Sequence, residues 1–267
     1  MDDGALARFG AEYARHRAAE GRGYDGDDLF RLPYLRTGAH ARQWRVRARS
    51  YEAFLRHELR PRAVSLGRPL RLIDLGAGNG WLSHRATLEG HSVVALDIRD
   101  DAVDGLGAAT AFAERAPELF ERIVAPFEAI PLASASLDLA VFNASLHYAV
   151  DLAAVLAEAA RVVRPGGRVV ILDSPFYRRE QDGAAMVAEK RANAARQFGD
   201  RAEALMALPF IEFLTPERLR FASSGLGLAW RRRRLWYPLW YELRPLQAAL
   251  EGRRPPSRFD LWTSARP

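Results

Sequence analysis

A glycine-rich loop preceded by an acidic residue is the first place where residue types and spacing point to chemistry. The stretch "LIDLGAGNG" places Asp74 two residues before Gly76, and Gly78 and Gly80 follow at steps of two. Glycines that open a helix after a strand let backbone amides approach a ligand, which favours a nucleotide-like group. A dinucleotide fingerprint needs a glycine at the sixth position, where this chain has Trp81, so a pyrophosphate site is disfavoured.

Two carboxylates at the ends of predicted strands narrow the choice of ligand further. Asp74 is expected to point toward the ligand crevice, where it suits an ammonium group or a cation better than a phosphate. Asp97 ends "VVALD", seventeen residues past Gly80, where a carboxylate can accept hydrogen bonds from both hydroxyls of a ribose. Together these residues predict a site for an amino acid joined to a nucleoside.

Composition excludes several kinds of chemistry. The 267 residues contain no cysteine, which rules out disulfides, thiolate metal sites and a cysteine nucleophile. The formal net charge is +6, but the arginines are scattered along the chain, so a nucleic-acid partner is not favoured. The start, "MDDGALARFG", has no basic and apolar signal regions, and no segment approaches 18 apolar residues, so a cytoplasmic location is expected.

Short apolar runs alternate with helical patterns along the chain, and the strands and helices that they predict must position the glycine-rich loop and Asp97. This rhythm is typical of an α/β fold with a doubly wound parallel sheet. The helix "DLAAVLAEAARVVR" is expected to stop at "PGG" (165–167). Strands are predicted at 71–75, 92–97, 121–125, 137–143 and 168–173.

Helical segments flank this core on both sides. An amino-terminal cap includes "ARQWRVRARSYEAFLRHEL", whose apolar face carries Arg47, with Arg49 on the opposite face. A helix over "EQDGAAMVAEKRANAARQF" forms an insertion, and a linking helix begins after Thr215 as cap. "LAWRRRRLWY" and "RFDLWTSA" are predicted as two closing strands. The expected divisions are a cap (1–66), a core (67–174), an insertion (175–225) and the closing strands (226–267).

Four motifs in order resemble one family. "DLGAGNG", the end of "VVALD", "IPLASASLDLAVFNASLHY" and "RVVRPGGRVVILDSP" are together similar to the class I S-adenosylmethionine-dependent methyltransferases of the small bacterial type, over about residues 68–174. The resemblance implies a Rossmann-like sheet of seven strands with the last one antiparallel. It also implies S-adenosyl-L-methionine as cofactor, S-adenosyl-L-homocysteine as product, and no metal.

The resemblance also assigns residues to the cofactor. The methionine moiety is expected against Asp74, Gly76, Ala77, Gly78, Asn79 and Gly80. The nucleoside is expected against Asp97, Ile98 and the backbone of Phe127, and the sulfonium beside Asn143 and Ala144. Pro126 stands where the family usually has an aspartate for the adenine amino group. An arginine from "QWRVRAR" would hold the cofactor carboxylate, and the helical face favours Arg47 over Arg49.

Methyl transfer is an in-line displacement, so a base is required only for a weakly acidic acceptor. His147, just past the fourth predicted strand, is the best-placed base by sequence, although a purely structural loop histidine is an equal alternative. Tyr148 is a candidate for the wall of the acceptor pocket, as are Tyr13, Tyr24 and Tyr34 from the cap, and ordinary packing is the favoured alternative for each of them taken alone. Asp138 is expected to cap its own turn.

Residues and motifs that the chain lacks exclude several classes of methyl acceptor. Without cysteine, adduct-forming methylation of pyrimidine carbon 5 and thiol-dependent arsenite methylation are excluded. The sequence after the fourth strand, 143–146, is Asn-Ala-Ser-Leu and not the Asn-Pro-Pro-aromatic of nucleobase amine methylation. The leading hypothesis is therefore a small organic acceptor with an oxygen or nitrogen nucleophile, held between cap and sheet.

Three other hypotheses stay open at the sequence level. "WRRRRLWYPLWYELRPL" (230–246) suits a weak membrane-surface contact and a lipid or quinone acceptor, RNA stacking, or ordinary strand packing. A non-catalytic cofactor-binding protein is another alternative. A Rossmann oxidoreductase is disfavoured by Trp81.

Overall fold

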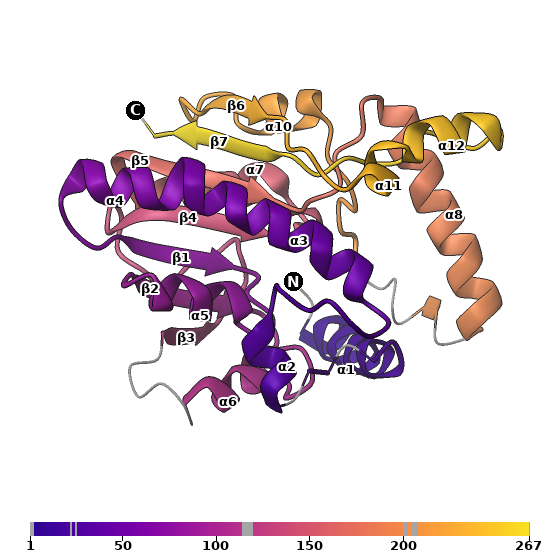
Figure 1. Ribbon diagram of the computed structural model, residues 1–267, viewed down its shortest axis with the longest axis horizontal. Helices are drawn as coiled ribbons and strands as arrows, with labels where there is room; N and C mark the ends of the chain where they lie inside the picture. Colours follow the sequence, from indigo (N-terminus) through magenta and orange to yellow (C-terminus); the bar gives the residue numbers. More distant parts are fainter. Residues whose placement is uncertain are drawn as a thin grey trace.

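A mixed sheet forms the centre of the molecule (Figure 1). The computed structural model describes residues 3–21, 23–24, 26–113, 120–199, 202–203 and 208–266. Within them, seven strands pair in the order β3-β2-β1-β4-β5-β7-β6. The strands are β1 (Arg71–Leu75), β2 (Ser92–Asp97), β3 (Glu121–Val124), β4 (Leu137–Asn143), β5 (Val163–Leu172), β6 (Ala229–Arg233) and β7 (Leu261–Ala265).

The topology confirms the predicted fold class. β1 to β5 run parallel to one another, and β7 runs antiparallel to both β5 and β6. The strand order reverses between β1 and β4, where chain connections diverge to opposite sides of the sheet. In open parallel sheets, such a reversal leaves a ligand crevice at the carboxyl ends of the strands.

Helices cover both faces because the central strands are apolar on both sides. Every residue of β4 is buried, as expected for a strand between two helical layers. One face is packed by α3 (Ala41–Phe54), the short π-helical η1 (Leu55–Leu59), α4 (Arg60–Leu66) and α5 (Trp81–Leu88). The other is packed by α7 (Leu152–Val162) and α10 (Pro216–Ala222).

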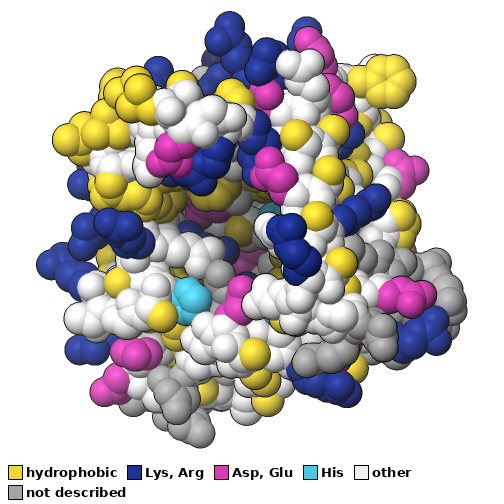
Figure 2. Space-filling model, turned by 90° about the vertical axis from the view of Figure 1, so that its right-hand side faces the viewer, with side chains coloured by type: hydrophobic (Ala, Val, Ile, Leu, Met, Phe, Trp, Pro, Cys, Tyr) yellow, Lys and Arg dark blue, Asp and Glu magenta, His cyan; other side chains and the backbone are white. Residues whose placement is uncertain are grey.

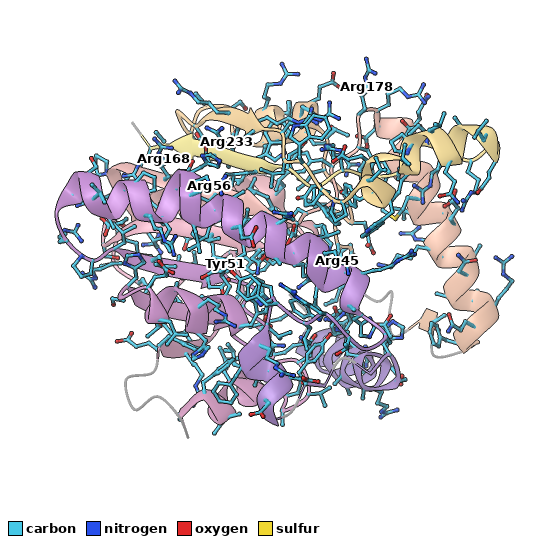
Figure 3. All side chains as sticks on the ribbon, in the orientation of Figure 1. Arg45, Tyr51, Arg56, Arg168, Arg178 and Arg233 are labelled. Atoms are coloured by element: carbon cyan, nitrogen blue, oxygen red, sulfur yellow. The ribbon has the colours of Figure 1, made fainter. Side chains whose placement is uncertain are left out.

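The α3–η1–α4 segment is part of the main core. Its buried Trp44, Tyr51 and Phe54 share one hydrophobic cluster with β1 and α5. Figure 3 shows Tyr51 on the sheet side of this segment, whereas Arg45 and Arg56 project outward. The predicted amphipathic face is therefore confirmed, and its apolar side fixes α3 beside the crevice.

The remaining helices lie around the carboxyl ends of the strands. α1 and α8 stand on the right of Figure 1, beyond the tips of the parallel strands. Thr215 caps α10 as predicted, because its hydroxyl accepts the Arg218 amide. The other helices are α1 (Asp3–Ala19), α2 (Gly26–Arg31), η2 (Leu106–Ala109), α6 (Thr110–Ala113), η3 (Leu146–Tyr148), α8 (Glu180–Phe198), α11 (Leu239–Glu242) and α12 (Arg244–Leu250).

The predicted start of the fifth strand is wrong. α7 ends at Val162 and β5 starts at once with Val163, which pairs with Leu137 before the register shifts. "PGG" therefore forms an irregularity inside β5, and Gly166 has a φ of 74° there. β5 therefore includes residues that the sequence periodicity assigned to the end of a helix.

The closing strands are shorter than predicted. The Asp260 carboxylate accepts the Leu235 amide at 3.1 Å and the Arg232 guanidinium at 2.7 Å, so side-chain bonds replace the ladder there. Pro238, which has no N–H, then starts the turn into α11.

Asp138 does not cap its own turn. Its buried carboxylate accepts hydrogen bonds from the two terminal guanidinium nitrogens of Arg68, each at 3.0 Å, and from the Arg71 amide at 2.8 Å. The Arg164 guanidinium lies 2.6 Å from the same carboxylate. Burial alone would raise the pKa of Asp138, but the hydrogen bonds of Arg68 and Arg71 and the charge of Arg164 outweigh it and lower the pKa. Asp138 therefore anchors the amino ends of β1, β4 and β5.

We predict that Asp138→Asn lowers the free energy of unfolding by about 1–3 kcal/mol at pH 7, because buried guanidinium bonds are lost. The lowered pKa means that this stabilisation exists above the unfolded value of 3.8. It should shrink only as the pH falls below about 4. Urea unfolding at pH 7 and at a pH below about 4 measures the difference in free energy of unfolding between the wild type and the variant. Asp28→Asn, which removes an exposed pair with Arg31, should change little, and equal effects of both substitutions would contradict the assignment.

Candidate functional site

A cavity of about 350 Å³ opens at the carboxyl ends of the parallel strands. Figure 2 shows the corresponding face, which is hollowed at its centre. The walls include parts of α1 and α3, the loops after β1, β2, β3, β4 and β5, and the segment near residue 210. The cavity thus lies at the strand-order reversal, as the sheet topology requires.

The glycine loop forms the floor of this cavity. Gly76 and Gly78 have φ values of 75° and 54°, in the left-handed region. A Cβ on Gly76 would lie 2.4 Å from the Ser145 Cβ, and one on Gly78 would lie 3.1 Å from the Asp104 carbonyl. No larger residue fits this cradle, and the backbone is therefore the surface that a ligand meets.

Asp97 fixes the loop and faces the cavity. One carboxylate oxygen accepts the Gly78 amide at 2.8 Å, and the other accepts the Arg99 amide at 2.9 Å. Burial raises the pKa of Asp97, although Arg99 opposes the shift. Each oxygen keeps a second lone pair, so the carboxylate can still accept hydrogen bonds from a ligand.

Asp74 does not line the cavity, contrary to the expectation that it points into the crevice. It is buried behind the loop, where Oδ2 accepts the Ser83 hydroxyl at 2.8 Å and Oδ1 has no hydrogen-bond partner. Burial raises the pKa of Asp74 to about 7 in spite of the Ser83 bond. Gly80 likewise lies outside the cavity wall, where it opens α5. Both residues support the loop from behind.

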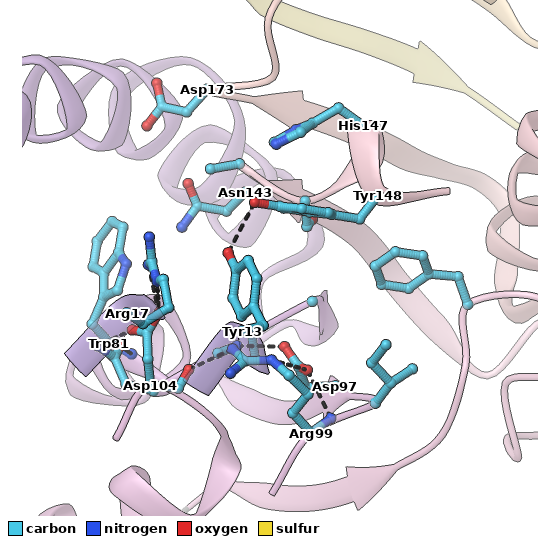
Figure 4. Close-up of a pocket in the computed structure, with 18 of the residues that line it drawn as sticks. Tyr13, Arg17, Trp81, Asp97, Arg99, Asp104, Asn143, His147, Tyr148 and Asp173 are labelled. Carbon is cyan, nitrogen blue, oxygen red and sulfur yellow. Dashed lines mark hydrogen bonds and ion pairs between the residues drawn. The ribbon is translucent and has the colours of Figure 1, made fainter. Parts of the chain in front are cut away.

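Helix α1 closes one side of the cavity. The Tyr13 hydroxyl is 2.9 Å from the Tyr148 hydroxyl, and Arg17 bonds the Asp104 carboxylate at 2.6 Å (Figure 4). The Arg99 guanidinium stacks 4.7 Å from the Tyr13 ring centroid. These contacts join α1 to the loops after β2 and β4, so α1 covers the site from above.

The two candidate arginines of α3 lie in different environments. Arg47 lines the cavity and stacks 5.1 Å from the Trp44 ring centroid. Arg49 points to solvent, where it pairs with Glu52 at 3.3 Å. The helical-face argument therefore selected the arginine that reaches the cavity.

A buried carboxylate at the end of β5 marks the opposite half of the cavity. Asp173 is 5% exposed, and its Oδ1 accepts the Ser50 hydroxyl while Oδ2 has no partner. The Tyr237 hydroxyl lies 2.9 Å from the Ser50 Oγ. Burial raises the pKa of Asp173 to about 6, although the charge of Arg47 and the Ser50 bond oppose it.

His147 lines the same half of the cavity. Figure 4 shows His147 and Asp173 pointing into one region, near Asn143. Burial lowers the pKa of His147 to about 3, and the charges of Lys190 and Arg47 add to the effect. Its Nδ1 is buried without a hydrogen-bond partner. The ring is therefore neutral near pH 7.

The structure brings most of the sequence-predicted residues together. Tyr34 does not reach the cavity, since it packs on Tyr51 at its partly exposed position. Those on the wall are Tyr13, Tyr24, Arg47, Gly76, Ala77, Gly78, Asn79, Asp97, Ile98, Phe127, Asn143, Ala144, His147 and Tyr148.

Sequence reasoning missed several wall residues. Asp173 had a usable signal, because it ends a strand as Asp97 does. Arg17, Asp104 and Phe210 had none, since their contacts join segments far apart in the chain.

The cavity fits the cofactor that the resemblance implies. The Cβ-free cradle at Gly76 and Gly78 leaves room for close backbone contact, and Asp97 offers paired acceptor oxygens to a ribose. Within the described ranges, no group of three or more His, Asp or Glu side chains is arranged to hold a metal ion.

Comparison with known proteins agrees with this reading of the fold. Residues 73–171 match the family model described as a methyltransferase domain. The malonyl-[acyl-carrier protein] O-methyltransferase of Hahella chejuensis is 34% identical over 169 residues, which are 57% of this chain and 59% of that protein. A ubiquinone/menaquinone biosynthesis C-methyltransferase of Methylobacterium nodulans is 33% identical over 47% of this chain and 49% of that one. The chain thus spans about half the length of these curated relatives.

Solved structures share the fold across nearly the whole chain. The geranyl diphosphate C-methyltransferase of Streptomyces coelicolor, in complex with S-adenosyl-L-homocysteine, superposes with a TM-score of 0.60 at 16% identity. The match covers 95% of this chain and 98% of that one. The sheet order, the glycine cradle, the matched domain and these similarities together support a class I S-adenosylmethionine-dependent methyltransferase.

Proposed function

We propose that the protein transfers a methyl group from S-adenosyl-L-methionine to an oxygen or nitrogen of a small organic acceptor, without a metal. The observation that carries this proposal is the joining of two halves in one cavity. One half holds the glycine cradle and Asp97, and the other holds the buried Asp173, whose Oδ2 lacks a partner.

The cofactor half is assigned from its donor and acceptor groups. Asp97 would accept the ribose hydroxyls, and Ile98 and Phe127 would flank the adenine. The loop backbone at 76–79 would meet the methionine moiety, with Arg47 on its carboxylate. Asp74 would act from behind the loop by holding the turn.

The acceptor half of the cavity contains a side chain that can accept a proton. Asp173 has a pKa of about 6, so it is mostly ionised at pH 7 and still basic enough to take a proton. His147, with a pKa of about 3, is a much weaker base and suits a hydrogen-bonding role toward the acceptor. We therefore place Asp173 ahead of His147 as the general base.

The proposed step balances as follows. The bound cofactor supplies a methyl group on a sulfonium sulfur, which keeps the electron pair of the broken bond. The acceptor oxygen or nitrogen bonds to the methyl carbon and gives its proton to the Asp173 carboxylate. Tyr148 and Phe210 would hold the acceptor, and α1 would exclude water through Tyr13 and Arg17.

One relative supports transfer to oxygen, and two other similar proteins are named for transfer to carbon. The Hahella protein is named an O-methyltransferase, and the Methylobacterium and Streptomyces proteins are C-methyltransferases. Mass spectrometry of cell extracts incubated with the protein and methyl-labelled cofactor identifies the acceptor directly. No labelled product from any extract would favour a non-catalytic cofactor-binding protein.

We predict that S-adenosyl-L-homocysteine binds in titration calorimetry and that NAD does not. Asp97→Ala should weaken binding about tenfold or more, because bonds to a charged acceptor contribute about 1.5–3 kcal/mol. Asp100→Ala changes a neighbouring exposed carboxylate that does not line the cavity, so it should keep the wild-type affinity. Binding of NAD alone would exclude the proposed cofactor.

We predict that Asp173→Asn lowers kcat by about 10²-fold or more, because a general base contributes that much. Wild-type kcat/KM should rise with pH through about 6, since the carboxylate must be ionised to accept the proton. The variant should lose this dependence and keep its affinity for S-adenosyl-L-homocysteine.

His147→Gln provides the matched comparison for this assignment. It should raise the KM of the acceptor and retain most of kcat. If His147→Gln abolishes turnover and Asp173→Asn does not, the base is His147 and the assignment to Asp173 is wrong.

A further inference from the structure

The helices α11 and α12 expose a stripe of leucines. Leu239, Leu243, Leu246 and Leu250 are 72%, 46%, 59% and 80% exposed. Leu239 and Leu243 lie four residues apart, as do Leu246 and Leu250, so each pair lies on one side of its helix, and the turn at Leu243 separates α11 from α12. Soluble surfaces carry single exposed leucines routinely, but four within twelve residues indicate an interaction surface.

The opposite side of this segment packs next to a residue of the cavity wall. Tyr241 is buried, and its hydroxyl accepts the amide of Phe259, a residue that lines the cavity. Trp240 stacks with Arg42 at the start of α3, at 5.4 Å. α11 and α12 are therefore held firmly by their inner side, and the leucine stripe faces outward beside the cavity.

Figure 2 shows the spatial relation of the stripe to the cavity. Hydrophobic side chains gather over α11 and α12 at the upper left of this face, next to the central hollow. A surface that seats on this patch would lie directly beside the mouth.

Aromatic and cationic residues flank the stripe in the sequence. Trp236 is 72% exposed and stacks with Arg234 at 4.9 Å. Residues 230–254 contain seven arginines and two glutamates, so this stretch carries a net positive charge. Arg234 pairs with Glu242 and Arg253 pairs with Glu251, but the two arginine side chains are still 58% and 63% exposed. Leucines and a tryptophan with flanking arginines are the composition of helices that lie in the interface of anionic membranes.

The shape of the stripe favours a lipid surface over a protein partner. A 12-residue helical segment is only about 18 Å long, and its apolar face is one side chain wide. A stable protein interface buries about 800 Å² on each partner. No helix among the described residues is long and apolar enough to cross a bilayer, so the fitting contact is shallow and peripheral.

We propose that α11, α12 and Trp236 form a docking surface for anionic lipid membranes, which places the mouth of the cavity at the lipid surface. The leucines and Trp236 insert among the acyl chains near the headgroups, and Arg234 and Arg253 contact lipid phosphates. Membrane binding through this surface is independent of which acceptor is methylated, and its test does not depend on methyl transfer.

Co-sedimentation of the full chain with vesicles tests the proposal. Binding to vesicles of equal phosphatidylglycerol and phosphatidylcholine should exceed binding to pure phosphatidylcholine at least tenfold, and 0.5 M salt should weaken it. A variant with Leu239, Leu243, Leu246 and Leu250 all changed to Gln should bind at least tenfold more weakly. Brominated lipids should quench fluorescence in the wild type more than in Trp236→Phe.

A matched control carries Leu88→Gln and Phe221→Gln, which change exposed apolar side chains elsewhere (61% and 83% exposed). It should bind vesicles like the wild type, and unchanged thermal unfolding should show that both variants are folded. The proposal is overturned if the wild type ignores vesicles or if the glutamine variant binds as well as the control. It is also overturned if sedimentation velocity shows a dimer that only the leucine stripe holds, or if an acyl-carrier protein binds the stripe while vesicles do not.

Discussion

The loops after β1 and β4 touch each other because Gly76 has no side chain. The Ser145 hydroxyl donates to the Leu75 carbonyl, and any Cβ on Gly76 would collide with the Ser145 Cβ. This contact brings the cofactor loop and the Asn143–Tyr148 loop to one place at the strand-order reversal. Both halves of the cavity depend on it, since a wider separation would split the site in two.

Two buried carboxylates outside the cavity, those of Asp138 and Asp260, are paired with arginines. Asp138 gathers Arg68 and Arg164 at the amino ends of the strands. Asp260 pairs with Arg232 and Arg258 where β6 ends and β7 begins. Many of the arginines that make the chain basic therefore have structural partners.

Local patterns in the sequence predicted the fold well because each strand and loop carried its own signal. Glycines two apart after an apolar run, Asp97 at a strand end and the apolar face of α3 all lie where short-range physics places them. The "PGG" segment was assigned wrongly because pairing between Leu137 and Val163 overrides a local helix-stop signal.

The site was predictable only in part, for the same reason. Asp74 was expected in the crevice, but burial against Ser83 turns its carboxylate behind the loop. The bonds between Arg17 and Asp104 and between Ser50 and Asp173 span 87 and 123 residues of sequence. No local pattern encodes such pairs, because they exist only once the layers have packed.

The chain from Tyr237 through Ser50 to Asp173 connects the outer helices with the centre of the cavity. Trp236 lies outside and Tyr237 inside, so one peptide unit separates a solvent-facing ring from a buried hydrogen-bond relay. Thermodynamic linkage makes such coupling reciprocal. If a ligand on the 236–241 segment alters the bond between Tyr237 and Ser50 and thereby the proton affinity of Asp173, protonation of Asp173 must alter the affinity for that ligand by the same factor.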